Sequence, residues 1–184
     1  MKTALLVIDM QNFFVEMCTD SLAQVIKLSE HFRKQKMPQF FTQHGHSEDE
    51  LTGKIKNQLV RKWGADGSIA TGSEDWQLMP KIEEAWKGAG EPNVVAKNTY
   101  DAFINTDLED RFKSEAIERV VVVGVMTDCC CDTTARSAFN RGFETWLVSD
   151  ACGSANKTQH QAGLKGFGFA FGEVVDTKTV LKRI

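Results

Sequence analysis

Short runs of apolar residues without polar alternation recur along the chain and alternate with longer amphipathic stretches. The apolar runs predict strands at Ala4–Ile8, Gln39–Thr42, Asn93–Ala96, Val120–Gly124, Glu144–Val148 and Glu173–Val175. The amphipathic stretches predict helices over residues 19–36, 75–87, 107–116, 129–141 and 157–170. The predicted order is therefore a strand followed by a helix, repeated along the chain.

The strand cores indicate how the sheet is built. Leu5 to Ile8 and Val120 to Val123 are apolar at every position, so both faces of these strands should be covered by helices. We therefore expect an α/β fold, a three-layer α/β/α sandwich with a mostly parallel, Rossmann-like six-stranded sheet. No internal repeat or linker interrupts the sequence, which predicts a single domain over residues 1–184. Residues 45–73 are polar and irregular and predict a functional or mobile loop.

The composition is that of an ordinary globular protein, with 42% hydrophobic and 26% charged residues. The net charge of −3 and the absence of a dense Lys and Arg stripe argue against a nucleic-acid partner. The first apolar run is too short for a signal-peptide core and no later run has the length of a membrane span, so we expect a cytoplasmic protein with no membrane partner. Five cysteines, three of them contiguous, make a poor disulfide framework and fit a reducing compartment.

Three chemically active side chains stand where predicted strands end. Asp9 follows the first strand, Lys97 follows the third, and Cys130 lies just beyond the fourth, at the start of a predicted helix. Ligands bind outside the carboxyl ends of the strands in an open parallel sheet, so these residues should share one edge. A helix N-terminus favours a thiolate, which makes Cys130 the candidate nucleophile.

Each of these residues also has a structural interpretation. Asp9 could cap the following turn, and Lys97 could be one of many surface charges. Cys129 and Cys131 are most simply packing residues, because free cysteine is among the most buried residue types. The shared position at the sheet edge is what favours the chemical interpretation of Asp9, Lys97 and Cys130.

Five stretches of the chain, in order, carry a resemblance to a known family. They are Val7–Asn12, Lys97–Phe103, Gly124–Cys130, Thr134–Phe139 and Ser149–Cys152. Together they resemble the isochorismatase-like cysteine hydrolase superfamily, which includes nicotinamidases, N-carbamoylsarcosine amidases, ureidoacrylate amidohydrolases and isochorismatases. The resemblance implies a hydrolase that cleaves a C–N bond of a small carboxamide, carbamoyl or ureido compound. We expect a small-molecule substrate, no cofactor and, as in relatives of this type, a homodimer or homotetramer.

The resemblance implies a catalytic triad of Cys130, Asp9 and Lys97. Lys97 would lower the pKa of the thiol and hold the carboxylate in place. Asp9 would take the thiol proton and later give it to the leaving amine, while attack on the carbonyl leaves a thioester for water to hydrolyse. Family members bind the oxyanion with backbone N–H groups, which here would come from Met126 and Cys130, beside a non-proline cis peptide at Val125–Met126.

The metal site of nicotinamidases is altered in this sequence. Those relatives carry Asp-x-His after the second strand and a further His downstream, which together hold a metal. The matching stretch here contains His44 and His46, and the downstream position falls near Asp66. Two histidines and a carboxylate can form a metal site, but histidines two apart in a loop more often face solvent or substrate. We therefore expect no metal, and nicotinamide is less favoured as the substrate.

Aromatic residues at the same sheet edge are candidates for the substrate pocket, because small-molecule sites are mostly apolar. Phe14 and Tyr100 flank Asp9 and Lys97 and are the first candidates. Further candidates are Gln11, Trp63, Trp76 and Phe103. Phe13, which replaces an acidic residue of nicotinamidases, adds an aromatic ring near the pocket.

Other classes of protein fit the sequence less well. A flavodoxin-like or dinucleotide-binding protein needs glycines in the first strand-to-helix turn, and residues 10–14 contain none. A thiol redox protein could pair Cys130 with Cys152, but the Cys-x-x-Cys spacing of dithiol sites is absent. Within the family, an isochorismatase-type vinyl ether hydrolase and a catalytically silent binding scaffold are the alternatives, and the intact triad argues against the scaffold.

Overall fold

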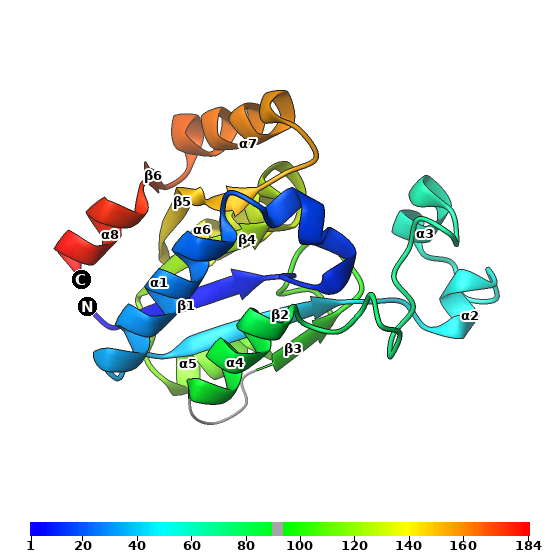
Figure 1. Ribbon diagram of the computed structural model, residues 1–184, viewed down its shortest axis with the longest axis horizontal. Helices are drawn as coiled ribbons and strands as arrows, with labels where there is room; N and C mark the ends of the chain where they lie inside the picture. Colours follow the sequence, from blue (N-terminus) through cyan, green and yellow to red (C-terminus); the bar gives the residue numbers. More distant parts are fainter. Residues whose placement is uncertain (90–93) are drawn as a thin grey trace.

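Six parallel strands form one sheet at the centre of the molecule (Figure 1). The computed structural model describes residues 1–89 and 94–184. The strands are β1 (Thr3–Ile8), β2 (Gln39–His44), β3 (Val94–Lys97), β4 (Arg119–Val125), β5 (Glu144–Gly153) and β6 (Glu173–Val175). Their order across the sheet is β3-β2-β1-β4-β5-β6, and every neighbouring pair is parallel. The predicted Rossmann-like sheet is confirmed, although Asn93 of the third predicted strand lies outside the described residues.

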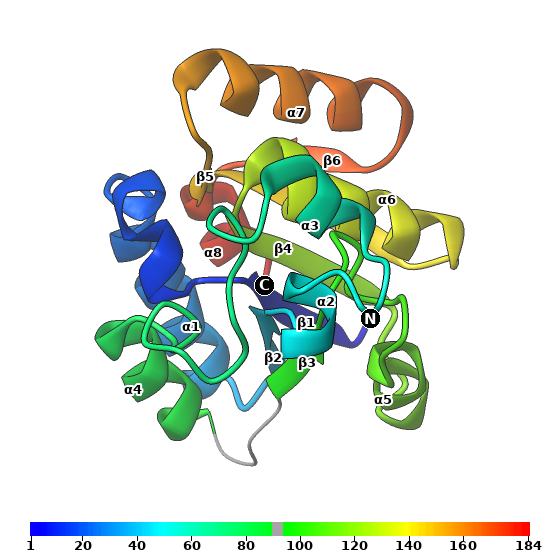
Figure 2. The same ribbon diagram turned by 90° about the vertical axis from the view of Figure 1, so that its right-hand side faces the viewer.

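Helices cover both faces of the sheet and complete the three layers (Figure 2). One face carries α1 (Leu22–Lys34), α4 (Pro80–Gly88) and α8 (Thr177–Arg183), and the other carries α5 (Leu108–Ser114), α6 (Asp132–Asn140) and α7 (Lys157–Ala170). Successive residues of β1 enter opposite cores: Leu5 and Val7 pack under α1, whereas Leu6 and Ile8 pack under the helices of the other face. Burial on both sides explains why the strand sequence shows no polar alternation.

The helix predicted over residues 75–87 is shorter in the structure. It begins only at Pro80, a residue suited to the first turn of a helix. Residues 75–77 form turns and a bend, and Leu78 forms an antiparallel bridge with Gln11 just beyond β1. A long-range backbone pairing of this kind overrides the local helical pattern.

The structure contains several short helical segments that the sequence did not predict. They are η1 (Asn12–Cys18), α2 (Glu48–Leu51), α3 (Gln58–Trp63), α8 and η2 (Thr127–Cys131). The last of these is a π-helical turn that replaces the start of the helix predicted from residue 129, and π-helical turns are frequent at functional sites. Segments of this length show too few turns for a hydrophobic period to reveal them.

Gly124 lets β1 and β4 approach each other near the carboxyl edge of the sheet. It pairs with Ile8, its φ is +114°, and an added Cβ would lie 2.1 Å from the Ile8 carbonyl oxygen. We expect Gly124→Ala to lower the free energy of unfolding by about 3 kcal/mol, because overlap with backbone cannot be relieved by a rotamer change. Urea denaturation measures the effect.

The matched control for this prediction is Gly53→Ala. Gly53 also has a positive φ of +79°, but an added Cβ there meets nothing within 4 Å. This variant should lose only about 1 kcal/mol, the cost of the backbone conformation alone. Equal losses in the two variants would show that the contact with Ile8 is not what constrains Gly124.

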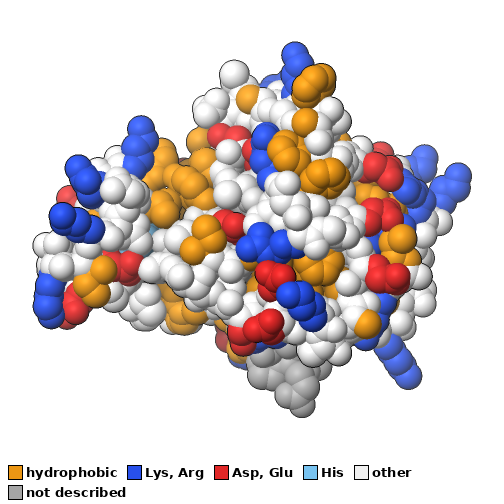
Figure 3. All heavy atoms as spheres, turned by 180° about the vertical axis from the view of Figure 1, so that it is seen from behind, with side chains coloured by type: hydrophobic (Ala, Val, Ile, Leu, Met, Phe, Trp, Pro, Cys, Tyr) orange, Lys and Arg blue, Asp and Glu red, His pale blue; other side chains and the backbone are white. Residues whose placement is uncertain are grey.

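One face of the molecule carries mixed charges. On the face turned away from the viewer in Figure 1, Lys and Arg side chains lie among Asp and Glu side chains (Figure 3). No helix in the described ranges, 1–89 and 94–184, is long and apolar enough to cross a membrane.

Candidate active site

Asp9, Lys97 and Cys130 meet at the carboxyl edge of the sheet. Asp9 directly follows β1, Lys97 is the last residue of β3, and Cys130 lies in η2 after β4. β1 and β4 are neighbours at the point where the strand order reverses, which is the usual ligand site of such sheets. The Lys97 ammonium lies 2.7 Å from Asp9 Oδ2 and 3.5 Å from Cys130 Sγ, and none of the three residues is more than 5% exposed.

Thr42 fixes the carboxylate of Asp9. The Thr42 hydroxyl donates to Asp9 Oδ1 at 2.5 Å and accepts the backbone N–H of Asp9 at 3.0 Å. Asp9 has a left-handed backbone with a φ of 47°, a conformation that costs free energy in residues other than glycine and that is concentrated at functional sites. With one carboxylate oxygen held by Thr42, the other is directed at Lys97.

Lys97 is a buried cation surrounded by acceptors. Besides its contact with Asp9, its ammonium donates to the carbonyl oxygen of Thr99 at 2.9 Å and lies 3.3 Å from Nδ1 of His44. Burial opposes the charge, but the contacts with Asp9 and Cys130 together outweigh it and raise the pKa of Lys97 above its ordinary value. Lys97 and Asp9 therefore form an ion pair at neutral pH.

The ionisation state of Cys130 differs from the expectation drawn from the sequence. Burial raises its pKa above the ordinary value and outweighs the opposing effect of Lys97, while the Asp9 carboxylate raises it further. The expectation that the helix end and Lys97 would favour a thiolate is therefore wrong for the resting site. Cys130 rests as a thiol beside a carboxylate, which is the arrangement of a nucleophile and its general base.

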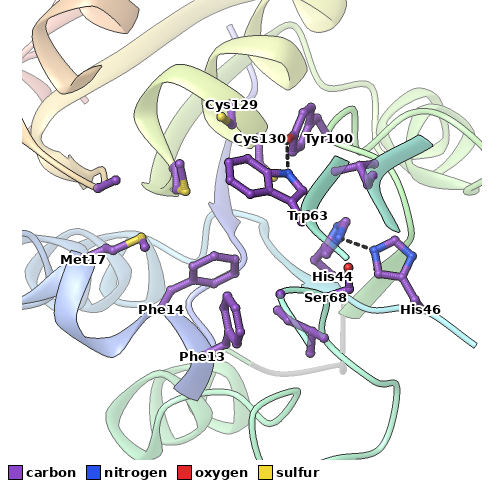
Figure 4. A pocket seen from close by; sticks show the side chains of 15 residues that line it. Phe13, Phe14, Met17, His44, His46, Trp63, Ser68, Tyr100, Cys129 and Cys130 are labelled. Atoms are coloured by element: carbon purple, nitrogen blue, oxygen red, sulfur yellow. Dashed lines mark hydrogen bonds between the residues drawn. The ribbon is translucent and has the colours of Figure 1, made fainter. Parts of the chain in front are cut away.

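A cavity of about 290 Å³ adjoins Cys130 (Figure 4). It is lined by Phe13, Phe14, Met17, His44, His46, Leu59, Trp63, Gly67, Ser68, Ile69, Tyr100, Met126, Cys129, Cys130 and Ala155. The indole Nε1 of Trp63 donates to the phenol oxygen of Tyr100 at 2.8 Å, which joins α3 to the segment after β3. The cavity is therefore an aromatic pocket with the thiol at its wall.

Three of the predicted pocket residues, Phe14, Trp63 and Tyr100, line this cavity. The prediction for Gln11 is wrong, because its side chain is fully buried and forms hydrogen bonds to the backbone of two other segments. Its amide nitrogen donates to the carbonyl oxygens of His44 and Trp76, and its amide oxygen accepts the N–H of His44.

The prediction for Phe103 is also wrong. Phe103 is 6% exposed and packs against Phe112 and Phe143 in the core on the α5 to α7 side. Trp76 likewise lies outside the cavity lining and packs against the opposite core. Phe103 and Trp76 both lie in irregular segments between strands and helices, but their side chains pack against the two cores rather than line the cavity.

Other lining residues were not singled out by the sequence. Met17 comes from η1, and Leu59 and Ile69 come from segments that lie far along the chain from any strand end. Ile69 is brought to the site by pairing, since the N–H of His46 donates to its carbonyl oxygen at 2.8 Å. No local pattern in residues 45–73 signals this pairing.

Met126 and Cys130, the residues expected to bind an oxyanion through their backbone, both border the cavity. The Val125–Met126 peptide bond is cis. The carbonyl oxygen of Met126 accepts N–H groups from Cys129 and Cys131 at 3.1 Å each, which anchors the π-helical turn. Cys131 is fully buried, as expected of a packing residue, whereas Cys129 is half-buried and lines the cavity.

The set His44, His46 and Asp66 does not assemble into a metal site. His44 Nε2 and His46 Nε2 lie 3.0 Å apart, but Asp66 is exposed and lies outside the cavity lining. In the described part of the chain, the only cluster of three metal-binding side-chain types is Asp9, His44 and Cys130. The Lys97 ammonium already lies among those atoms, so a metal cation there would face a fixed positive charge.

Known proteins are similar to this chain in sequence and in fold. The family model described as the Isochorismatase domain matches residues 3–179. Nicotinamidase 3 from Arabidopsis thaliana is 36% identical over 94% of this chain and 84% of that protein. A cysteine hydrolase from Pseudomonas syringae pv. phaseolicola 1448A has a TM-score of 0.85 at 24% identity, covering 99% of this chain and 92% of that chain. The nicotinamidase/pyrazinamidase PncA from Bacillus subtilis has a TM-score of 0.83 at 24% identity, covering 96% and 100% of the two chains.

Proposed function

The chain belongs to the isochorismatase family of hydrolases, and from this premise we propose that it is a cysteine-dependent amidohydrolase. It cleaves a C–N bond of a small carboxamide, carbamoyl or ureido compound and releases ammonia or an amine. The observation that carries the proposal is the convergence of Asp9, Lys97 and the Cys130 thiol at the wall of one cavity. A general base, a cation and a nucleophile are the parts that attack on a carbonyl requires.

The reaction proceeds in two halves. Asp9 accepts the thiol proton as Cys130 Sγ attacks the substrate carbonyl, and backbone N–H groups of Met126 and Cys130 bind the oxyanion that forms. Asp9 then donates that proton to the leaving nitrogen, the C–N bond breaks, and a thioester remains on Cys130. Water next attacks the thioester, gives a proton to Asp9, and the acid product leaves as the proton returns to Cys130. Lys97 keeps the carboxylate oriented throughout.

The cavity favours an uncharged substrate. The described residues that line it include no Asp, Glu, Lys or Arg. His44 is neutral, because burial, aided by the nearby Lys97, lowers its pKa to about 4. A charged group entering this cavity would lose its hydration without gaining a partner. Flat, apolar amides therefore fit best, and the rings of Phe14 and Trp63 offer surfaces on which an aromatic substrate can pack.

A matched pair of amides tests this preference. We expect 3-nitrobenzamide to be hydrolysed with a kcat/KM roughly 100-fold higher than that of its carboxylate isostere, 3-carbamoylbenzoate, because only the second must bury a charge. Ammonia release is measured for both, with nicotinamide and N-carbamoylglycine in the same panel. A preference for the carboxylates would contradict the argument from the cavity wall, and no ammonia from any amide or carbamoyl compound would contradict the amidohydrolase proposal.

A further inference from the structure

A row of buried polar side chains leads away from Lys97 and takes no part in the proposed reaction. His44 Nδ1 lies 3.3 Å from the Lys97 ammonium. His44 Nε2 lies 3.0 Å from His46 Nε2 (Figure 4). His46 Nδ1 faces Glu50 Oε2 at 3.8 Å. His44, His46 and Glu50 are 6%, 2% and 7% exposed. The row therefore joins a buried cation to a buried carboxylate through two imidazoles.

The cation fixes the hydrogen positions at one end of the row. Both imidazoles are neutral, since burial lowers the pKa of His44 and of His46, and a neutral imidazole has one N–H group and one acceptor nitrogen. The Lys97 ammonium can only donate, so His44 Nδ1 must accept and the hydrogen of His44 lies on Nε2. That hydrogen is donated to His46 Nε2, and the hydrogen of His46 consequently lies on Nδ1.

The carboxylate selects the same direction from the other end. The N–H at His46 Nδ1 faces the negative charge of Glu50, at a distance where the interaction is electrostatic rather than a direct hydrogen bond. The reverse arrangement would direct an N–H of His44 at an ammonium and a lone pair of His46 at a carboxylate. Both contacts would be repulsive, so only one pair of tautomers satisfies the two charges.

Glu50 is held as a carboxylate by its surroundings. It accepts hydrogen bonds from the backbone N–H of Ser47 at 2.9 Å and from the side-chain amides of Asn57 at 2.8 Å and Asn98 at 2.7 Å. Burial opposes its charge, but these three donors outweigh it and lower the pKa of Glu50. The negative end of the row is therefore fixed in place as well as in charge.

We propose that Glu50 is a positioning residue that acts through His46 and His44 on Lys97. Its charge favours the same tautomers of both imidazoles that Lys97 selects from the other end, so that His44 accepts from Lys97 and steadies the ammonium against Asp9. The role rests on the proposed function, because the position of Lys97 matters for turnover only if Asp9 activates Cys130. Without the charge, only Lys97 opposes the reverse arrangement, in which the hydrogen of His46 lies on Nε2 and that of His44 on Nδ1, so the tautomers are less firmly fixed.

Nitrogen-15 NMR of the imidazoles tests the tautomers directly. The chain has four histidines, so His31→Gln and His160→Gln variants leave the signals of His44 and His46 to be assigned. The metal content of the sample is measured first. At pH 7, the spectra should then show Nε2–H for His44 and Nδ1–H for His46. The opposite pair of tautomers would overturn the proposal. So would a bound metal with both Nε2 atoms free of hydrogen, because the metal would then replace the hydrogen bond between the rings.

Glu50→Gln tests the dependence on charge. The glutamine keeps the size of the side chain and an oxygen for the Ser47 N–H. We expect His46 to lose its fixed Nδ1–H signal and kcat to fall about tenfold, the effect of one weakened hydrogen bond to a charged group. The matched control is Asp49→Asn, which removes the neighbouring carboxylate of α2, an exposed partner of Lys54. It should change neither the tautomers nor kcat.

The outcomes separate this inference from the proposed function. If Glu50→Gln leaves the histidine signals and kcat unchanged while the protein hydrolyses amides, Glu50 serves only to cap the first turn of α2 with Ser47, and the inference is wrong. If the tautomers are as expected but no amide is hydrolysed, the row exists and the proposed function fails. If Glu50→Gln lowers kcat with the tautomers intact, the loss arises from the loop and the relay through His46 is rejected.

Discussion

Replacing Cys130 by serine is expected to lower kcat/KM by roughly 10⁴-fold or more, the loss seen when a catalytic nucleophile is removed. A serine hydroxyl is far less acidic than a thiol, so it is a much poorer nucleophile at neutral pH. Hydroxylamine added to the wild-type reaction should intercept the thioester and yield the hydroxamate of the substrate acid. The Cys130→Ser reaction should yield none. Rates follow from ammonia release, and the hydroxamate is identified by mass spectrometry.

The matched control is Cys131→Ala, which removes the neighbouring thiol. Cys131 is fully buried in the core, away from the cavity lining, so its loss should cost stability and leave hydroxamate formation intact. A Cys130→Ser variant that keeps most of the wild-type rate, with no trapped adduct in either protein, would exclude covalent catalysis. A general-acid mechanism led by Asp9, as in cleavage of a vinyl ether, would then be preferred.

The position of Asp9, Lys97 and Cys130 could be predicted because it follows from strand ends alone. Each apolar run ends abruptly near one of them, and parallel strands bring their carboxyl ends to one edge. The charge state of Cys130 could not be predicted in the same way. It depends on how completely the thiol is buried, and the elements packed against η2 include α7 and β5, which lie further along the chain.

The pocket residues show a second limit. Phe103 and Tyr100 lie in the same segment after β3, yet Tyr100 faces the cavity and Phe103 packs in the core. Sequence position gives no side-chain direction in an irregular segment, whereas in β1 the period of two does. The contact of His44 with Lys97 depends likewise on the register between β2 and β3, where these residues are paired. The sequences of these two short strands do not specify that register on their own.

The ion pair between Lys97 and Asp9 should dominate the stability of the site. In Lys97→Met the side chain keeps its approximate length but loses its charge, and Asp9 is left as a buried carboxylate without its cation. Breaking a buried pair by removing one partner costs about 3–5 kcal/mol, so the free energy of unfolding should fall by that amount at pH 7. Urea denaturation at pH 7 measures it.

The double variant Asp9→Asn with Lys97→Met separates charge from packing. It removes both charges, so most of the stability lost in Lys97→Met should return, because no unpaired ion remains in the core. Activity should not return, since neither the base nor the cation that orients it is present. If the double variant is as unstable as Lys97→Met, the loss comes from packing around residue 97 and the ion pair is not the cause.

Wild type and Lys97→Met should differ in the free energy of unfolding by an amount that depends on pH. This dependence follows from the upward shift of the Lys97 pKa in the folded protein. Because the Asp9 carboxylate raises that pKa in the folded protein despite burial, the stabilisation is fully present below the ordinary lysine value of about 10.4. It is lost only as the pH rises through the higher folded value. The stability gap between the two proteins should therefore stay constant from pH 6 to 9 and shrink above it, and a gap that closes near neutral pH would show that Lys97 is not held as a cation.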